Sequence, residues 1–257
     1  MYASTDEEGW ENTLEIVPDL VAIAGGDGAV GKVLRRLAGS SVPATLLPLG
    51  TANNIAASLG LSADLDELVG SWTSGQLRRY DLGTITGPDG EGLFVEAVGG
   101  GLFADAIARA EDSASGTEDK VELGLRILRG VVADAEPRPW QLRLDAIDES
   151  HDLLAVEAMV IGRTGPGIPL APTADVGDAM LDVVFVGEPE RKQLATYVDG
   201  RLANASPSPP QLPIRRAKDV ELVPPEGTRL RVDDEPLASS GPVRVSTGTH
   251  SVEILMP

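Results

Sequence analysis

The stretch Asp19–Leu61, DLVAIAGGDGAVGKVLRRLAGSSVPATLLPLGTANNIAASLGL, decides the fold of this 257-residue chain. It predicts a strand over 19–24, a glycine turn carrying one acid, a helix over 29–39, a second strand over 43–48, and a second glycine turn opening a helix over 52–60. Two such turns at the same end of adjacent parallel strands direct backbone N–H groups outward, where helix dipoles favour an anion. The stretch therefore predicts a phosphate-binding edge.

Three interpretations compete for the first turn. As a P-loop, the run that starts at Gly26 fits every position except the last, where Val33 lacks the hydroxyl that should ligate magnesium. As a dinucleotide fingerprint, it lacks the acid expected about 20 residues later, since no Asp or Glu lies between Asp27 and Asp64. The third interpretation keeps the acid: a nucleotide loop in which Asp27 acts beside the phosphates.

The third interpretation leads to a family. The turn Gly25–Gly28, followed by PLGTANN over 48–54, resembles the diacylglycerol kinase catalytic family, in particular the bacterial lipid kinases related to sphingosine kinases. That family also carries an Asp-Gly-x-Leu segment and an Asp-x-Glu segment, and Asp178–Asp182 and Val232–Pro236 correspond to them in the expected order. The pair of glycine turns is the specific signal, whereas the two later segments are weak individually. The resemblance runs from about Asp19 to the C-terminus.

The chain departs from the family pattern at several places. Ala29 stands where the family usually has Thr, Ala179 where it has Gly, and Asp234 where it has the middle Gly of the Asp-Gly-Glu segment. The family opens with a strand, an Asn-Pro-x-x-Gly turn and a helix, which residues 1–18 do not show. Two strands make a poor sheet, so the C-terminal segment, a partner chain or a missing N-terminal stretch must complete it. We expect a truncated N-terminus and an incomplete ATP site.

Beyond residue 78 the pattern changes from strand–helix alternation to short strands. Leu142 and Leu144 alternate with polar residues, as in a half-buried antiparallel sheet. One helix is predicted over 118–135, where Ser115 and Glu118 have capping-box spacing, and another over 191–203. The predicted strands in this half include 93–98, 153–161, 181–186, 243–246 and 251–255.

The predicted fold class is an α/β nucleotide-binding lobe with a parallel sheet, plus a second lobe like a β-sandwich. The first lobe is expected to cover residues 1–78 and the second, mainly β, residues 79–257. We expect the last residues to return to the first lobe and the active site to lie in the cleft between the lobes.

The resemblance implies roles for individual residues. It makes Glu235 the general base, with Asp27 as the alternative carboxylate. It also implies a structural magnesium held by Asp178, the Met180 carbonyl and Asp175, although an ordinary acidic loop has the same spacing. The nucleotide-binding positions are Gly25, Gly26, Asp27, Gly28, Ala29, Gly31, Thr51 and Asn53. Turn-forming and helix-capping roles remain open for Asp27, Thr51 and Asn53.

Composition is consistent with a cytosolic globular protein. The chain is 42% apolar and has no cysteine, which excludes disulfides and thiolate metal sites. Nothing resembles a signal peptide, and no apolar run approaches the roughly 18–20 residues that span a bilayer. The net charge of −19 argues against nucleic acid as a partner.

The resemblance implies a lipid kinase that transfers the γ-phosphate of ATP, with Mg²⁺, to a hydroxyl such as that of diacylglycerol during transient contact with a membrane surface. A non-catalytic relative that binds nucleotide or lipid is a second hypothesis, motivated by Ala29 and the short N-terminus. A soluble NAD-kinase-like enzyme is a third, because NAD kinases carry a Gly-Gly-Asp-Gly turn, although without PLGTANN. An exposed edge of a short sheet would favour a homodimer.

Overall fold

The N-terminal lobe is built on two parallel strands. The computed structural model describes residues 3–15, 17–61, 64–88, 90–113, 119–237 and 241–257. Strand β1 (Val21–Gly25) pairs with β2 (Ala44–Pro48), and α1 (Asp27–Leu37) connects them. The apolar residues of α1 recur at helical spacing and are buried. The other elements of this lobe are short: η1 (Trp10–Leu14), α2 (Asn54–Leu59), α3 (Leu65–Gly70) and η2 (Ser71–Thr73).

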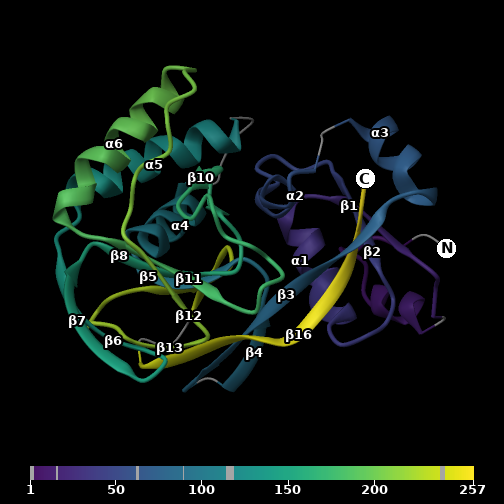
Figure 1. The fold of residues 1–257 in the computed structure, drawn as a ribbon. Helices are drawn as coiled ribbons and strands as arrows, with labels where there is room; N and C mark the ends of the chain where they lie inside the picture. Colours follow the sequence, from purple (N-terminus) through teal and green to yellow (C-terminus); the bar gives the residue numbers. More distant parts are fainter. Residues whose placement is uncertain (1–2, 16, 62–63, 89, 114–118, 238–240) are drawn as a thin grey trace.

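One long C-terminal strand joins the two lobes. Strand β16 (Val243–Met256) lies parallel to β2, with Ile254 opposite Ala44, and antiparallel to β3 (Gln76–Gly87), as Figure 1 shows. Of the three predicted ways to complete the small sheet, the structure shows the C-terminal segment. The prediction of two separate strands, 243–246 and 251–255, was wrong because the register shift between Thr247 and His250 is an irregularity within one strand.

Two sheets pack face to face. The larger continues from β1 and β2 of the N-terminal lobe into the second lobe, in the order β1-β2-β16-β13-β6-β7, and beside this path β3 pairs with both β16 and β4. The smaller has the order β12-β11-β8-β5-β14-β15. One apolar core contains residues of both sheets, as in a sandwich. The remaining strands are β4 (Gly90–Phe94), β5 (Ala97–Gly101), β6 (Arg138–Leu144), β7 (Ile147–Leu153), β8 (Ala155–Met159), β9 (Arg163–Thr164), β10 (Ile168–Pro169), β11 (Leu181–Val186), β12 (Ile214–Ala217), β13 (Asp219–Val223), β14 (Leu230–Val232) and β15 (Glu235–Leu237).

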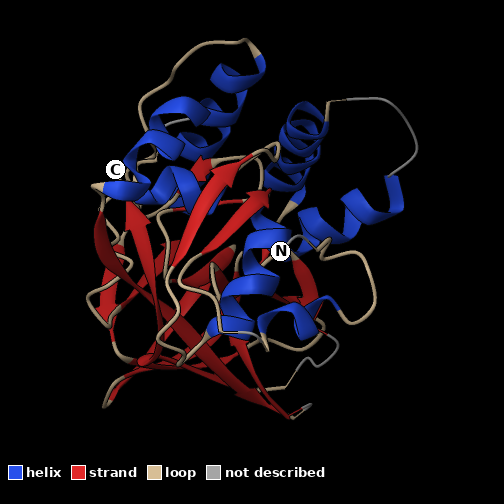
Figure 2. Cartoon of the chain, turned by 90° about the vertical axis from the view of Figure 1, so that its right-hand side faces the viewer, coloured by secondary structure: helices blue, strands red, loops and turns tan. Residues whose placement is uncertain are grey.

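Three helices cover the other face of the smaller sheet. They are α4 (Leu102–Ser113), α5 (Lys120–Asp134) and α6 (Glu188–Leu202), and a second apolar core lies beneath them. Every residue of β8 and β11 is buried because both faces of these strands are covered, whereas β6 alternates. Figure 2 shows most of the helices on the upper side and the strands filling the lower part. The predicted fold class is confirmed.

Several predicted boundaries change. The predicted strand 93–98 is two strands that separate at Val95 and Glu96, and 153–161 belongs to both β7 and β8. Helix α5 is capped by Asp119, whose carboxylate accepts the N–H groups of the second and third helical residues. The predicted capping residues 115 and 118 lie outside the described residues.

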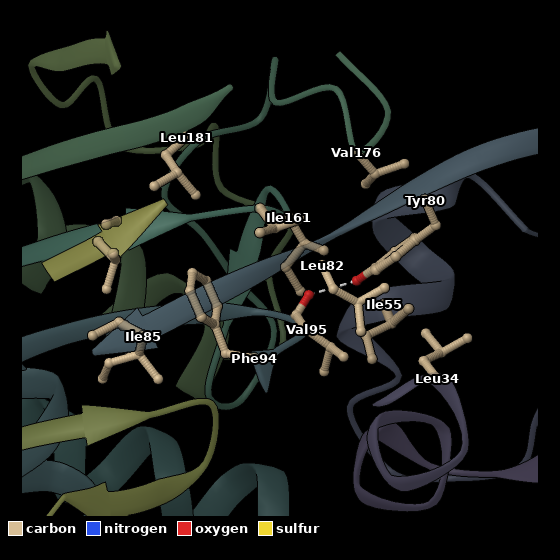
Figure 3. Close-up of a cluster of buried hydrophobic side chains, with 14 of the residues drawn as sticks. Leu34, Ile55, Tyr80, Leu82, Ile85, Phe94, Val95, Ile161, Val176 and Leu181 are labelled. Atoms are coloured by element: carbon tan, nitrogen blue, oxygen red, sulfur yellow. Dashed lines mark hydrogen bonds between the residues drawn. The ribbon is translucent and has the colours of Figure 1, made fainter. Parts of the chain in front are cut away.

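The two lobes share one core. Leu34 and Ile55 of the first lobe lie near Tyr80 and Leu82 of β3, and the Tyr80 hydroxyl donates a hydrogen bond to the Val95 carbonyl at 2.6 Å (Figure 3). A shared core fixes the position of the glycine turns relative to the sandwich. Within the described ranges, no helix is long and apolar enough to cross a membrane.

Candidate active site

The two glycine turns meet backbone to backbone. Because β1 and β2 are parallel neighbours, the turns after Gly25 and Pro48 lie at the same edge of the sheet. A Cβ atom at Gly50 would overlap the Cα atom of Gly26. Only glycine lets the turns approach this closely. The structure therefore brings the two predicted glycine turns together at one edge of the sheet, and phosphate binding there stays a prediction.

Asp27 ties these turns together. It is the first residue of α1, and its carboxylate accepts the backbone N–H groups of Asn54 at 2.8 Å and Ile55 at 3.0 Å. Those N–H groups begin α2, so Asp27 caps α2 from a neighbouring element. Burial raises the pKa of Asp27, and the two N–H groups oppose that shift. The carboxylate thus has a positioning contact, and its role as a base stays a prediction.

The N-terminus of α1 is suited to an anion. Gly26 precedes the helix and has no side-chain cap, so the first N–H groups present the positive end of the helix dipole. Lys32, the lysine of the P-loop interpretation, contacts the N-terminal segment instead. Its Nζ atom lies 3.3 Å from the Thr5 carbonyl oxygen and 3.6 Å from the Asp6 carboxylate. The structure therefore opposes the P-loop interpretation.

The predicted nucleotide contacts on α1 have different surroundings. Gly28 is exposed with open space around its Cα atom, and Ala29 packs close to Gly25. Gly31 is buried, where a Cβ atom would lie 3.2 Å from a Val95 methyl group. Close packing of α1 against Val95 accounts for a glycine at this position, and a contact of Gly31 with nucleotide stays a prediction.

The second turn leaves one hydroxyl free for a ligand. Thr51 is exposed, whereas Asn53 folds back on its own turn with φ 49°. The Asn53 side chain accepts the Gly50 N–H group at 2.9 Å and donates to the Gly50 carbonyl at 2.8 Å. Asn54 reaches across to the second lobe and donates to the Gly165 carbonyl at 2.9 Å. The geometry favours Thr51 as a nucleotide contact and gives Asn53 a turn-stabilising role.

The Asp-x-Glu segment forms the tight hairpin β14–β15. Asp233 has φ 52°, and its carboxylate accepts the backbone N–H groups of Val95, Glu96 and Ala97, the shortest at 2.7 Å. Arg35 of α1 forms an ion pair with the same carboxylate. Asp233 therefore anchors the hairpin to both β5 and α1. The sequence did not predict this role, because Arg35 lies far away in the chain.

A buried ion pair stabilises the β14–β15 hairpin. Arg231 and Glu157 are both buried, with Nη2 2.7 Å from Oε2, and Arg231 also donates to the Thr164 hydroxyl at 2.7 Å. Burial raises the pKa of Glu157, and Arg231 opposes the shift. A Cβ atom at Gly99 would overlap the Glu157 carboxylate, which explains the glycine. A lone acid in the apolar run 153–161 was the available sequence signal.

An apolar cavity of about 300 Å³ opens beside the second glycine turn. Thr51 and Ala52 form the wall next to the turn, and the side chains of α4 and α5 form the apolar wall. Asp234 and Arg231 complete the wall on the hairpin side. We call this space the apolar cavity; its described lining residues are Thr51, Ala52, Phe103, Ala106, Ile107, Ala110, Lys120, Val121, Gly124, Leu128, Thr164, Gly165, Pro166, Arg231 and Asp234.

A further acid lies near this cavity. Glu96 is 5% exposed, and burial raises its pKa well above the ordinary value, with the charges of Asp27, Asp233 and Asp234 adding to the shift. The predicted base Glu235, by contrast, is exposed at the start of β15 and does not line the cavity. The sequence signal for Glu96 was again a single acid between apolar residues.

The predicted magnesium ligands have arginine partners. Asp178 forms an ion pair with Arg216, and Asp175 lies 3.1 Å from the Arg78 guanidinium. The Gly177 N–H group and Arg78 lower the pKa of Asp175. The Met180 N–H group donates a hydrogen bond to the Asp178 carboxylate at 3.0 Å. Within the described chain, no cluster of three or more Asp, Glu or His side chains could hold a metal ion. Oxygen donors suit magnesium, but here arginine pairs with both carboxylates, and the magnesium site stays a prediction.

Fold and site together define a class: a two-lobed phosphotransferase with glycine turns on a parallel sheet and a sandwich lobe. Residues 4–85 match the family model described as diacylglycerol kinase catalytic domain. Residues 97–256 match the model described as YegS C-terminal NAD kinase beta sandwich-like domain. The chain belongs to the family of diacylglycerol kinases and YegS-like lipid kinases, as the resemblance implied.

Two bacterial relatives have names that agree with this family. The chain is 26% identical over 245 residues to "Diacylglycerol kinase" of Mycobacterium tuberculosis (strain CDC 1551 / Oshkosh), covering 93% of this chain and 77% of the relative. It is 26% identical over 237 residues to "Probable lipid kinase YegS-like" of Klebsiella pneumoniae (strain 342), covering 89% and 75%.

Solved structures share the fold. A diacylglycerol kinase from Bacillus anthracis str. Sterne superposes with a TM-score of 0.69 at 17% identity, covering 98% of this chain and 82% of that chain. An NAD kinase from Archaeoglobus fulgidus in complex with ATP superposes with a TM-score of 0.51 at 12% identity, covering 96% and 79%.

Proposed function

We propose that this protein transfers the γ-phosphate of ATP to the hydroxyl group of a lipid such as diacylglycerol. The observation that carries the proposal is the position of the apolar cavity, which shares Thr51 and Ala52 with the phosphate-binding edge. An acyl chain in this cavity would present its polar end toward the phosphates. This arrangement suits a highly charged phosphate donor such as ATP and a lipid acceptor that is mostly hydrocarbon.

The glycine turns would hold the phosphate donor. The uncapped N–H groups at the start of α1 offer hydrogen bonds to phosphate oxygens, and Asp27 fixes the second turn against the first. Thr51 adds a free hydroxyl at the same edge. Mg²⁺ bound to the nucleotide would screen its charge. Phosphoryl transfer depends mainly on such positioning and electrostatics.

The lipid acceptor implies transient contact with a membrane surface. The resemblance assigns the acceptor proton to Glu235 or Asp27, as proposed above. Pairing with a second copy of the chain remains an untested expectation.

The test is transfer of radiolabelled phosphate from ATP and Mg²⁺ to diacylglycerol in mixed micelles, with NAD as the competing acceptor. Ala106→Phe fills the apolar cavity, and Ala108→Phe is the matched control on the same helix, because Ala108 does not line the cavity. We expect Ala106→Phe to lower lipid phosphorylation about tenfold or more while leaving the KM for ATP unchanged.

Each outcome of this test supports a different one of the three hypotheses. Transfer to diacylglycerol that is lost in Ala106→Phe but kept in Ala108→Phe supports the lipid kinase. Phosphorylation of NAD without lipid transfer would support the NAD-kinase-like hypothesis. Nucleotide affinity without transfer to either acceptor would indicate a binding protein.

A further inference from the structure

Four carboxylates lie around the junction of the glycine turns and the apolar cavity, and three of them are engaged or enclosed. Asp27 caps α2. Asp233 accepts three backbone N–H groups and the Arg35 guanidinium. Glu96 is 5% exposed, and the raised pKa of this group favours its neutral form. Each of these three carboxylates is thus already engaged by other groups of the protein or favours its neutral form.

The fourth carboxylate, Asp234, is exposed and lines the apolar cavity. No hydrogen bond or ion pair to another described residue occupies its side chain. Among the described lining residues it supplies the acidic group, whereas the lining residue Arg231 is already paired with Glu157. An acceptor hydroxyl between the cavity and the glycine turns would therefore meet the Asp234 carboxylate.

The backbone holds Asp234 at this position. It follows Asp233 in the two-residue turn of a hairpin whose strands pair Val232 with Glu235. Arg231 donates to the Asp233 carbonyl, and the Asp233 carboxylate binds the start of β5. A turn fixed on both sides gives Asp234 a defined direction. Glu235, the next residue, does not line the cavity.

We propose that Asp234 is the catalytic base that receives the proton of the acceptor hydroxyl. This inference rests on the proposed lipid kinase function. The hydroxyl oxygen forms a bond to the γ-phosphorus, and the bond from that phosphorus to the bridging oxygen breaks, which leaves ADP. The hydroxyl proton moves to the Asp234 carboxylate and from there to solvent. The family pattern has a glycine at this position, so the role belongs to this chain.

The test compares Asp234→Asn with Asp152→Asn, a matched control on β7 that does not line the cavity, and with Glu235→Gln, which removes the base that the resemblance implies. All three side chains are exposed, and each substitution keeps the shape while removing the charge. We expect Asp234→Asn to lower kcat for diacylglycerol at least ~100-fold, the usual size of a general-base contribution, with an unchanged KM for ATP. Asp152→Asn should keep kcat within about threefold, since it leaves that contribution intact, and Glu235→Gln should lose much less rate than Asp234→Asn. Asp234→Glu, which keeps the charge, should restore part of the rate.

The failures are distinguishable. If the unsubstituted protein phosphorylates diacylglycerol and Asp234→Asn keeps most of that rate, the inference is overturned and the proposed function stands. The same holds if Glu235→Gln loses as much rate as Asp234→Asn, because the base is then not Asp234 alone. If the unsubstituted protein phosphorylates no lipid, the proposed function fails and this inference fails with it.

Discussion

The glycine-turn edge and the loop 175–182 were both predicted as binding sites from one resemblance, yet their polar groups have different partners in the structure. At the edge, the N-terminus of α1 keeps its N–H groups uncapped by any side chain. In the loop, Asp175 and Asp178 are paired with Arg78 and Arg216. A motif places the right atoms in a segment, but partners from distant segments decide whether those atoms are free.

The largest expected effect comes from a substitution that disrupts the contact between the two glycine turns. Gly50→Ala forces a Cβ atom into the Gly26 backbone, which cannot yield as a side chain could. We expect the free energy of unfolding to fall by about 3 kcal/mol. The matched control is Gly28→Ala, because nothing lies within 4 Å of an added Cβ atom there. Urea denaturation of both variants checks this, and equal stability would show that the turns do not touch.

The next effect distinguishes the positioning of the second glycine turn by Asp27 from ordinary helix capping. Asp27→Ala removes the cap of α2 and should cost about 1 kcal/mol. Asp119→Ala removes the cap of α5 and should cost a similar amount. Only Asp27→Ala should weaken ATP binding, measured by calorimetry, because only Asp27 holds the second glycine turn. Equal ATP affinity in the two variants would contradict this role.

A buried acid on β11 gives a pH-dependent effect near the loop. Burial raises the pKa of Asp182 to about 6 from 3.8, with Arg216 opposing the shift. The folded protein binds this proton more tightly than the unfolded chain, so Asp182 costs stability as pH rises through 4 to 6. Asp182→Asn should therefore stabilise the protein by roughly 1 kcal/mol at pH 8 and have no effect below about pH 4. Thermal unfolding from pH 3.5 to 8 measures it; a gain that persists at low pH would exclude this cause.

The smallest effect concerns the arginine pairs of the loop. Arg216 and Asp178 are partly exposed, so Arg216→Ala should change the free energy of unfolding by less than about 1 kcal/mol. Because arginine holds the acids, 5-fold changes of Mg²⁺ or added EDTA should leave the melting temperature of the unsubstituted protein unchanged, within about 1 °C. A lower melting temperature with EDTA would show that a divalent cation does bind.

Local pattern predicted the glycine turns and the buried strand β11, because glycine geometry and apolar runs are encoded within a few residues. It missed the continuity of β16, since a long strand with a shifted register resembles two short ones. It also missed the Arg35–Asp233 and Arg231–Glu157 contacts. These join segments far apart in the chain, and no spacing rule relates them.

Amide NMR of the isotopically labelled protein tests the contrast between the two regions most directly, with MgCl₂ added first and ATP second. We expect Mg²⁺ alone to leave the amide signals of 175–182 unchanged, and ATP to shift those of Gly26–Ala29 and Thr51. Shifts of the loop with Mg²⁺ alone, together with silence at the glycine turns when ATP is added, would contradict the account.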